Sequence, residues 1–158
     1  MSAKTITIEQ ADSILRITLN RPAKRNALNQ ELVGALIDAF DTARDASEVR
    51  VVVLTGEGST FSAGADLAAL KKLQSASRED NEYDSSLLAK LFTTICRHPK
   101  IVIARVNGHA VAGGCGLVAA ADFAIAADTA KLGFTEVKIG FVPAIVSTIL
   151  VGRLRGAD

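Results

Sequence analysis

The sequence predicts one α/β domain over residues 1–158, and two observations carry this prediction. Stretches rich in β-branched residues alternate along the chain with stretches in which apolar residues recur at helical spacing. Hydrophobic residues make up 49% of the 158 residues and charged residues 22%, which is typical of a globular chain with a real core. No repeat, low-complexity segment or linker divides the sequence.

The first third of the chain is expected to form two strands and a helix. Residues 14–19 alternate between apolar and polar, as a half-buried strand does. A basic turn at 21–26 precedes Asn29, the expected N-cap of the helix. Residues 49–54 are apolar apart from Arg50, which predicts a buried parallel strand. The apolar stripe of the helix is formed by Leu32, Val33, Leu36, Ile37 and Phe40.

Two helices are expected in the middle of the chain. A short one follows the segment 61–66 and runs through Leu70, after which residues 74–86 are polar and expected to be mobile. The second ends at His98, because the residue before a proline disfavours helical backbone. Its apolar stripe is Leu87, Leu88, Leu91, Phe92 and Ile95.

The last third is expected to contain two buried strands, at 101–106 and 123–127. Between them, residues 112–116 read Ala-Gly-Gly-Cys-Gly and open a short apolar helix. Pro143 is expected to open a last helix. The sequence stops soon after that helix begins, so we expect the chain to be a C-terminally truncated fragment.

Charge and cysteine content exclude several classes of protein. The 18 basic and 17 acidic residues give a net charge of +1, which lacks the excess of positive charge that is typical of nucleic-acid-binding proteins. Two cysteines are too few for a disulfide scaffold and suggest a reducing compartment. The start resembles no signal peptide, and Asp122 interrupts the longest apolar run. We therefore expect a cytoplasmic protein with neither a nucleic-acid nor a membrane partner.

The glycine-rich segment admits three interpretations. The pattern Gly114-x-Gly116-x-x-Ala119 loosely fits a dinucleotide fingerprint, with Asp128 or Glu136 as the ribose acid. Only about six residues separate Gly116 from the next strand, whereas the crossover between two parallel strands needs about a dozen. The dinucleotide interpretation is therefore disfavoured. A second interpretation is that the glycines permit close packing of a helix on a strand.

The third interpretation is an oxyanion site. Free N–H groups at a helix start attract negative charge, so Gly113 N–H is one candidate donor. Ala63, in the loop segment before Gly64, is the candidate for the second N–H. Each such donor stabilises a transition state by about 3–4 kcal/mol. Glu136, twenty residues after Gly116, is the candidate group for moving a proton.

Five stretches of the sequence carry a family resemblance: residues 19–28, 61–67, 104–117, 121–127 and 135–143. In family order and covering nearly the whole chain, they resemble the crotonase superfamily, also called the enoyl-CoA hydratase/isomerase family. The last of them is most similar to the branch containing methylglutaconyl-CoA hydratases. The resemblance implies a crotonase-like spiral of ββα units that lacks the family's C-terminal helical trimerisation region.

The resemblance further implies an acyl-CoA thioester substrate, with no separate cofactor and no metal. The thioester carbonyl would lie between the N–H groups of Ala63 and Gly113, where an enolate would develop. If the protein is full-length, the family implies a homotrimer or hexamer. The expected substrate-binding residues are Lys24 and Arg25 for the CoA phosphates, Ala65, Asp66 and Leu67 at the adenine, and Gly114.

The sequence departs from the family pattern at Gly116, where hydratases of this family carry a glutamate. The other glutamate position matches Glu136. We favour reversible hydration of an α,β-unsaturated acyl-CoA, with Glu136 as the acid and base. The alternatives are a Δ3-Δ2 enoyl-CoA isomerase that uses the same glutamate, and a non-catalytic acyl-CoA binder or inactive fragment.

Overall fold

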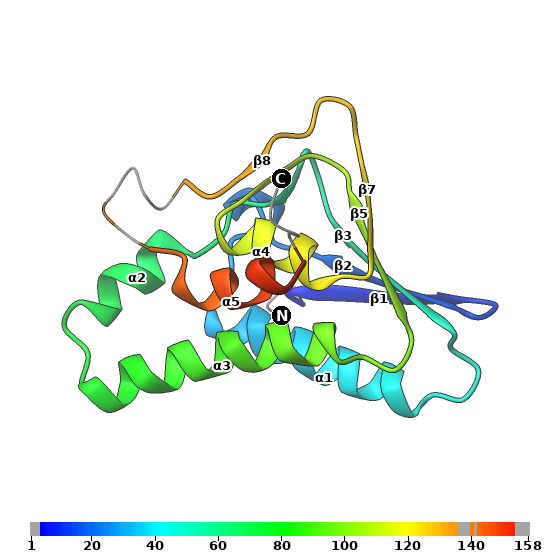
Figure 1. Cartoon of the computed structure of the whole chain (residues 1–158), viewed down its shortest axis with the longest axis horizontal. Coiled ribbons are helices and arrows are strands. Elements are labelled where there is room, and N and C mark those ends of the chain that lie inside the picture. The colour runs from blue at the N-terminus through cyan, green and yellow to red at the C-terminus, as the bar shows by residue number, and fades with distance from the viewer. Residues whose placement is uncertain (1–3, 136–139, 141, 154–158) are drawn as a thin grey trace.

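The larger of two sheets contains five strands in the order β1-β2-β3-β5-β7 (Figure 1). A computed structural model of the chain describes residues 4–135, 140 and 142–153. The first two strands form an antiparallel hairpin, and the others add to it in parallel. The strands are β1 (Ile6–Ala11), β2 (Ile14–Leu19), β3 (Val51–Gly56), β5 (Ile101–Val106) and β7 (Phe123–Ala126).

The smaller sheet contains three parallel strands in the order β4-β6-β8. They are β4 (Thr60–Ser62), β6 (His109–Val111) and β8 (Leu132–Gly133). None of the three was predicted, because two or three residues are too few to show an alternating pattern.

Each strand of the smaller sheet follows directly on a strand of the larger one: β4 after β3, β6 after β5, and β8 after β7. Helices α2 (Leu67–Leu73) and α3 (Arg78–Cys96) follow β4, α4 (Gly113–Ala120) follows β6, and α5 (Ala144–Arg153) follows β8. This succession confirms the expected spiral of ββα units. Gly108 makes it compact, since a Cβ there would lie 2.0 Å from the carbonyl oxygen of Ser59 in the preceding unit.

The helices α1 (Gln30–Asp45) and α3 lie side by side (Figure 1). Helix α4 packs between α3 and the sheets, and α5 contacts α4 and α3. Asn29 caps α1 as predicted, and its side chain accepts a hydrogen bond from the Leu32 N–H. The expected apolar stripe of α1 is buried. In α3, only the C-terminal half of the expected apolar stripe is buried. The largest fully buried side chains include Phe40, Phe61, Phe92, Leu36, Leu54 and Leu117.

Two predictions about the elements were wrong. Residues 74–86 were expected to be a mobile stretch, but α3 begins at Arg78, with the Ser77 side chain as its N-cap. Its first turns are polar because they are exposed, and Arg78 pairs with Glu82 one turn later. Strand β7 was expected to be buried. It lies at an edge of the sheet, and Phe123 and Ile125 are 61% and 66% exposed.

Among the described residues, no helix has the length and apolar character needed to cross a membrane.

Candidate active site

The loop between β2 and α1 is held by Asn26, a residue to which the sequence analysis gave no role. Its side chain is fully buried, and its Oδ1 accepts a hydrogen bond from the Arg21 N–H at 2.9 Å. Its Nδ2 donates to the carbonyl oxygens of Glu57, at 2.9 Å, and Thr60, at 2.7 Å. Asn26 has a left-handed φ of 52°, which asparagine tolerates better than most residues. This side chain therefore fixes the loop against the start of β4.

The segment that follows β4 pairs with Leu28 in a short parallel bridge centred on Ala65. The Leu28 N–H donates to the Gly64 carbonyl at 2.7 Å, and the Asp66 N–H donates to the Leu28 carbonyl at 2.8 Å. Successive N–H groups of an extended chain point in opposite directions, so the Ala65 N–H points away from Leu28. Within the described part of the chain, the Ala65 N–H has no acceptor.

The Ala63 N–H, expected as a donor of the oxyanion site, is already engaged. It donates to the carbonyl oxygen of Arg25 at 2.9 Å. Each residue has a single backbone donor, so the prediction that Ala63 offers its N–H to a ligand was wrong. The N–H that this segment leaves unpaired is that of Ala65, two residues later.

The second unpaired donor lies at the start of α4, which begins at Gly113 as the sequence predicted. First-turn N–H groups have no acceptor within a helix, and no side chain caps this one. The N–H groups of Gly113 and Gly114 find no acceptor among residues 4–135, 140 and 142–153. A helix N-terminus of this kind stabilises a negatively charged oxygen.

Gly64 brings the two donors onto adjoining segments. A Cβ at Gly64 would lie 3.1 Å from the Gly113 nitrogen and 2.6 Å from the Cβ of Ala112. The φ of Gly64 is +80°, a value that residues with a side chain rarely adopt. Gly64 follows β4 and packs against the start of α4, so a glycine is needed at this position. The N–H groups of Ala65 and Gly113 flank this contact.

Gly114 and Gly116 support the close-packing interpretation of the glycine-rich segment. A Cβ at Gly114 would lie 2.5 Å from the Ser62 carbonyl oxygen. A Cβ at Gly116 would lie 2.8 Å from both Phe92 Cζ and Val146 Cγ2, and both of those side chains are buried. The position at which the resemblance implied a glutamate is thus enclosed by apolar side chains.

Asp66 has two structural roles. Its carboxylate forms an ion pair with Arg21 at 2.9 Å and caps α2 by accepting hydrogen bonds from the N–H groups of Ala68 and Ala69. Burial raises the pKa of Asp66, but the hydrogen bonds from Arg21 and the two N–H groups outweigh it and lower the pKa below 3.8. Asp66 is therefore a stable anion that joins α2 to the loop at 21–28.

The remaining expected binding residues lie at the surface. Lys24 ends the short 3-10 helix η1 (Pro22–Lys24), and both Lys24 and Arg25 are exposed. Leu67, the first residue of α2, is 65% exposed. Glu136, the expected acid and base, lies outside the described residues. Within those residues, no group of three or more His, Cys, Asp or Glu side chains is arranged to hold a metal ion.

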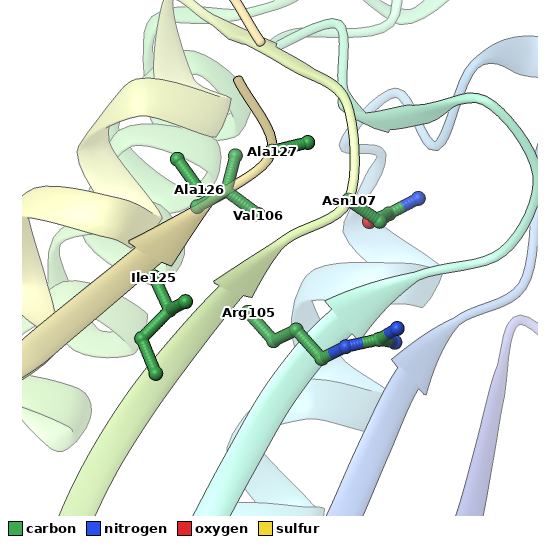
Figure 2. Close-up of a pocket in the computed structure, with 6 residues that line it drawn as sticks. All are labelled: Arg105, Val106, Asn107, Ile125, Ala126 and Ala127. Atoms are coloured by element: carbon green, nitrogen blue, oxygen red, sulfur yellow. The ribbon is translucent and has the colours of Figure 1, made fainter. Parts of the chain in front are cut away.

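Among the pockets of the described part, two have volumes of about 240–250 Å³. One is lined by Arg25, Thr60, Ala63, His109, Val111 and Lys131. The other lies where β5 and β7 end and is lined by Arg105, Val106, Asn107, Ile125, Ala126 and Ala127 (Figure 2). There the Asn107 side chain serves the fold, because it accepts from the Gly56 N–H and donates to the Gly58 carbonyl.

Comparison with known proteins agrees with this architecture. One relative is a Thermus thermophilus protein whose name contains the words enoyl-CoA hydratase. The two sequences are 48% identical over 135 residues, which cover 85% of this chain and 53% of that protein. The crotonyl-CoA hydratase of Syntrophomonas wolfei is 37% identical, over 99% of this chain and 59% of the relative. The chain therefore spans little more than half the length of these relatives.

Solved structures show the same fold. A Legionella pneumophila protein described as an enoyl CoA hydratase/isomerase (crotonase) superposes with a TM-score of 0.91 at 39% identity. The match covers 96% of this chain and 58% of that one. A family model described as enoyl-CoA hydratase/isomerase matches residues 9–157. The chain belongs to the enoyl-CoA hydratase/isomerase family.

Proposed function

We propose that the protein binds an acyl-CoA thioester with its carbonyl oxygen between the N–H groups of Ala65 and Gly113. One observation carries this proposal. The N–H groups of Ala65 and Gly113 have no acceptor in the described part, and they belong to two segments that are in contact at Gly64. An enolate places its negative charge on that oxygen, and each donor stabilises it by about 3–4 kcal/mol. The relatives named as enoyl-CoA hydratases support a thioester of this class.

The proposed reaction is reversible hydration of an α,β-unsaturated acyl-CoA with Glu136 as the acid and base. The carboxylate takes a proton from water while the oxygen of that water forms a bond to C3. The electron pair of the double bond moves onto the thioester oxygen, where the two N–H groups stabilise it. Protonated Glu136 then gives its proton to C2. The resemblance of residues 135–143 to methylglutaconyl-CoA hydratases favours a methylglutaconyl-type substrate.

The rest of the substrate would extend over the surface residues beside these donors. In this proposal Lys24 and Arg25 attract the CoA phosphates, and the backbone at Asp66 and Leu67 lines the adenine. Gly114 offers a third N–H at the same helix start. For a protein of the length of its relatives, we also propose assembly into a homotrimer or hexamer.

The Δ3-Δ2 isomerase remains the second candidate, because one observation favours chemistry with a single acid. The Cβ direction of Gly116 meets Phe92 and Val146, so no second carboxylate stands at this position. One glutamate suffices to move a proton between C2 and C4. Offering 2-enoyl-CoA and 3-enoyl-CoA separates the reactions, since hydration removes the absorbance of the conjugated thioester and isomerisation creates it.

The donor pair is tested by replacing Gly113 with proline. Proline is tolerated at the first position of a helix and has no N–H, so Gly113→Pro removes one donor. We expect kcat to fall by about 10²–10³-fold. Gly113→Ala is the matched control, because it keeps the N–H. Its Cβ would meet the flexible end of Leu28 at 3.2 Å and the Cα of Gly64 at 3.9 Å, an ordinary van der Waals contact. Equal activity of the proline variant and the parent would refute the donor pair.

Glu136→Gln tests the proton-transfer step. We expect turnover of either enoyl-CoA to be abolished, with CoA binding, measured by calorimetry, retained. Full activity of this variant would refute the role of Glu136. Binding of CoA by the parent chain without turnover of any enoyl-CoA would support the third alternative, a non-catalytic binder or inactive fragment.

A further inference from the structure

Ser62, the last residue of β4, has a fully buried side chain whose hydroxyl makes two hydrogen bonds. The hydroxyl donates to the backbone carbonyl oxygen of Asn26 at 2.9 Å and accepts from the Gly64 N–H at 3.3 Å. It is therefore satisfied both as a donor and as an acceptor, away from water. Through these two bonds Ser62 joins the loop at 21–28 to the segment that follows β4.

The bond from Gly64 to Ser62 restrains the most adaptable residue of that segment. Gly64 has a φ of +80°, and glycine has access to more backbone conformations than any other residue. The carbonyl oxygen of Gly64 is held as well, because it accepts from the Leu28 N–H at 2.7 Å. Both backbone polar groups of Gly64 are thus restrained, one by Ser62 and the other by Leu28.

The orientation of Gly64 decides where the Ala65 N–H points. The Gly64 carbonyl and the Ala65 N–H belong to one trans peptide group, in which they point in opposite directions. A rotation of the backbone at Gly64 would therefore turn the Ala65 N–H as well. The hydroxyl of Ser62 is thus connected to this donor through Gly64.

Ser62 also packs against the first turn of α4. A Cβ at Gly114 would lie 2.8 Å from the Ser62 Cβ and 2.5 Å from the Ser62 carbonyl oxygen, so the two segments are in close contact here. Helix α4 begins at Gly113, whose N–H is the other donor of the proposed pair. One buried residue therefore contacts both of the segments that carry the donors.

We propose that Ser62 is a positioning residue that fixes the spacing and direction of the Ala65 and Gly113 N–H groups. The inference rests on the proposed function and deepens it, because it names the group that keeps both donors directed at one oxygen. Donors stabilise a developing charge best when they are oriented before it forms, and a displacement of about 1 Å costs up to about 100-fold in rate. Loss of the hydroxyl should release Gly64 and let the Ala65 N–H turn away from the thioester.

Three variants of the chain separate this role from a merely structural one. Ser62→Ala removes the hydroxyl and keeps the Cβ that packs on α4. Ser62→Cys is the conservative variant, because a thiol is a weaker donor and acceptor in the same place. Thr55→Val is the matched control, because Thr55 is also buried and its hydroxyl donates to the Arg105 carbonyl at 2.9 Å, in the larger sheet.

The direct readout is the infrared band of the thioester carbonyl in bound butyryl-CoA, a saturated thioester that can be neither hydrated nor isomerised. A heavy carbon isotope in this carbonyl distinguishes its band from those of the protein amides. Hydrogen bonds to the carbonyl oxygen polarise it and lower the frequency, so the parent should shift the band below its value in free butyryl-CoA. We expect Ser62→Ala to lose most of this shift, Ser62→Cys to lose part of it and Thr55→Val to keep it.

Two further measurements distinguish positioning from a general loss of structure. CoA, which has no thioester carbonyl, should bind all four proteins with equal affinity by calorimetry. With 2-enoyl-CoA as substrate, Ser62→Ala should lower kcat by about 10–100-fold and leave KM nearly unchanged, because oriented donors act mainly in the transition state. Ser62→Cys should recover part of the lost kcat.

The proposal is overturned if Ser62→Ala is folded by circular dichroism and keeps the carbonyl shift of the parent. It is also overturned if Thr55→Val loses as much of the shift as Ser62→Ala does. If Ser62→Ala does not fold, an unchanged shift in Ser62→Cys overturns it. Failure of the proposed function is a different result: the parent itself then binds no butyryl-CoA, or binds it without a shift, and the donor pair and the role of Ser62 are both overturned.

Discussion

The guanidinium of Arg21 lies 2.9 Å from the carboxylate of Asp66 and connects the loop before α1 to the N-cap of α2. Arg21 also donates to the carbonyl oxygen of Ala27, so one side chain ties together both strands of the bridge centred on Ala65. Only 17% of the Arg21 side chain and 12% of the Asp66 side chain are exposed, so water screens this pair weakly. Its loss should therefore be measurable, unlike that of a surface pair.

Asp66→Asn should destabilise the protein by about 1.5–3 kcal/mol at pH 7, because it removes the charge from this hydrogen-bonded pair. The pKa of Asp66 is lowered in the folded state, so its contribution is complete above the unfolded value and is lost as the pH falls through the folded one. The difference between parent and variant should thus shrink below pH 3.8. Urea unfolding across this range measures it.

The exposed pair Arg16–Glu9 provides the control for this measurement. Its side chains are 54% and 65% exposed, and surface pairs contribute about 0–1 kcal/mol. Glu9→Gln should therefore change the free energy of unfolding little at any pH. An Asp66→Asn effect as small as this at pH 7 would contradict the role assigned to the buried pair.

Asn26→Ala should be among the more damaging substitutions of a polar residue. It leaves the Arg21 N–H and the carbonyls of Glu57 and Thr60 without their partner in a site that excludes water. We expect a loss of about 2–4 kcal/mol in the free energy of unfolding, measured by urea denaturation. Asn20→Ala is the control, because the single side-chain hydrogen bond of Asn20, to Lys4, is exposed. Equal effects of the two substitutions would contradict this assignment.

The sequence was sufficient to predict the elements that carry a local signal. The N-cap Asn29 and the stripe of α1, the apolar run of β3 and the glycine start of α4 all appear where expected. Strands β4, β6 and β8 were missed because two or three residues are too few to show an alternating pattern. Their pairing is decided by contacts between units that lie far apart in the chain.

In the candidate site, too, one donor has a local sequence signal and the other depends on contacts with residues far away in the chain. Gly113 could be predicted, since an uncapped helix start leaves its N–H unpaired by geometry alone. The choice between Ala63 and Ala65 could not, because alternate N–H groups of an extended segment face opposite ways. Which of them remains unpaired depends on the partners Arg25 and Leu28, and these are known only once the loop at 21–28 is placed.

Ala112 holds a backbone conformation that suits glycine better. Its φ of 52° and ψ of −128° lie outside the regions favoured by residues with a Cβ, and it immediately precedes the donor Gly113. Ala112→Gly should therefore stabilise the protein by about 1 kcal/mol, with thermal unfolding as the measurement. Ala89→Gly, in the interior of α3, should instead destabilise it by about 0.5–1 kcal/mol. Destabilisation by both would argue against strain at Ala112.

Gly116 should tolerate no side chain, because its Cβ direction ends 2.8 Å from both Phe92 and Val146. We expect Gly116→Ala to destabilise the protein by about 1–3 kcal/mol through overpacking. Gly34→Ala is the matched control, since nothing lies within 4 Å of a Cβ there and alanine is the better helix former. That variant should gain up to about 1 kcal/mol.

A double-mutant cycle identifies the cause at Gly116. Shortening the side chain opposite it with Phe92→Leu creates space at the place where the new methyl group would clash. Each single substitution should destabilise the protein, but the double variant should lose less than the sum of the two, by about 0.5–3 kcal/mol. Strict additivity would mean that the cost of Gly116→Ala does not arise from Phe92, and the enclosed apolar wall at this position would have to be abandoned.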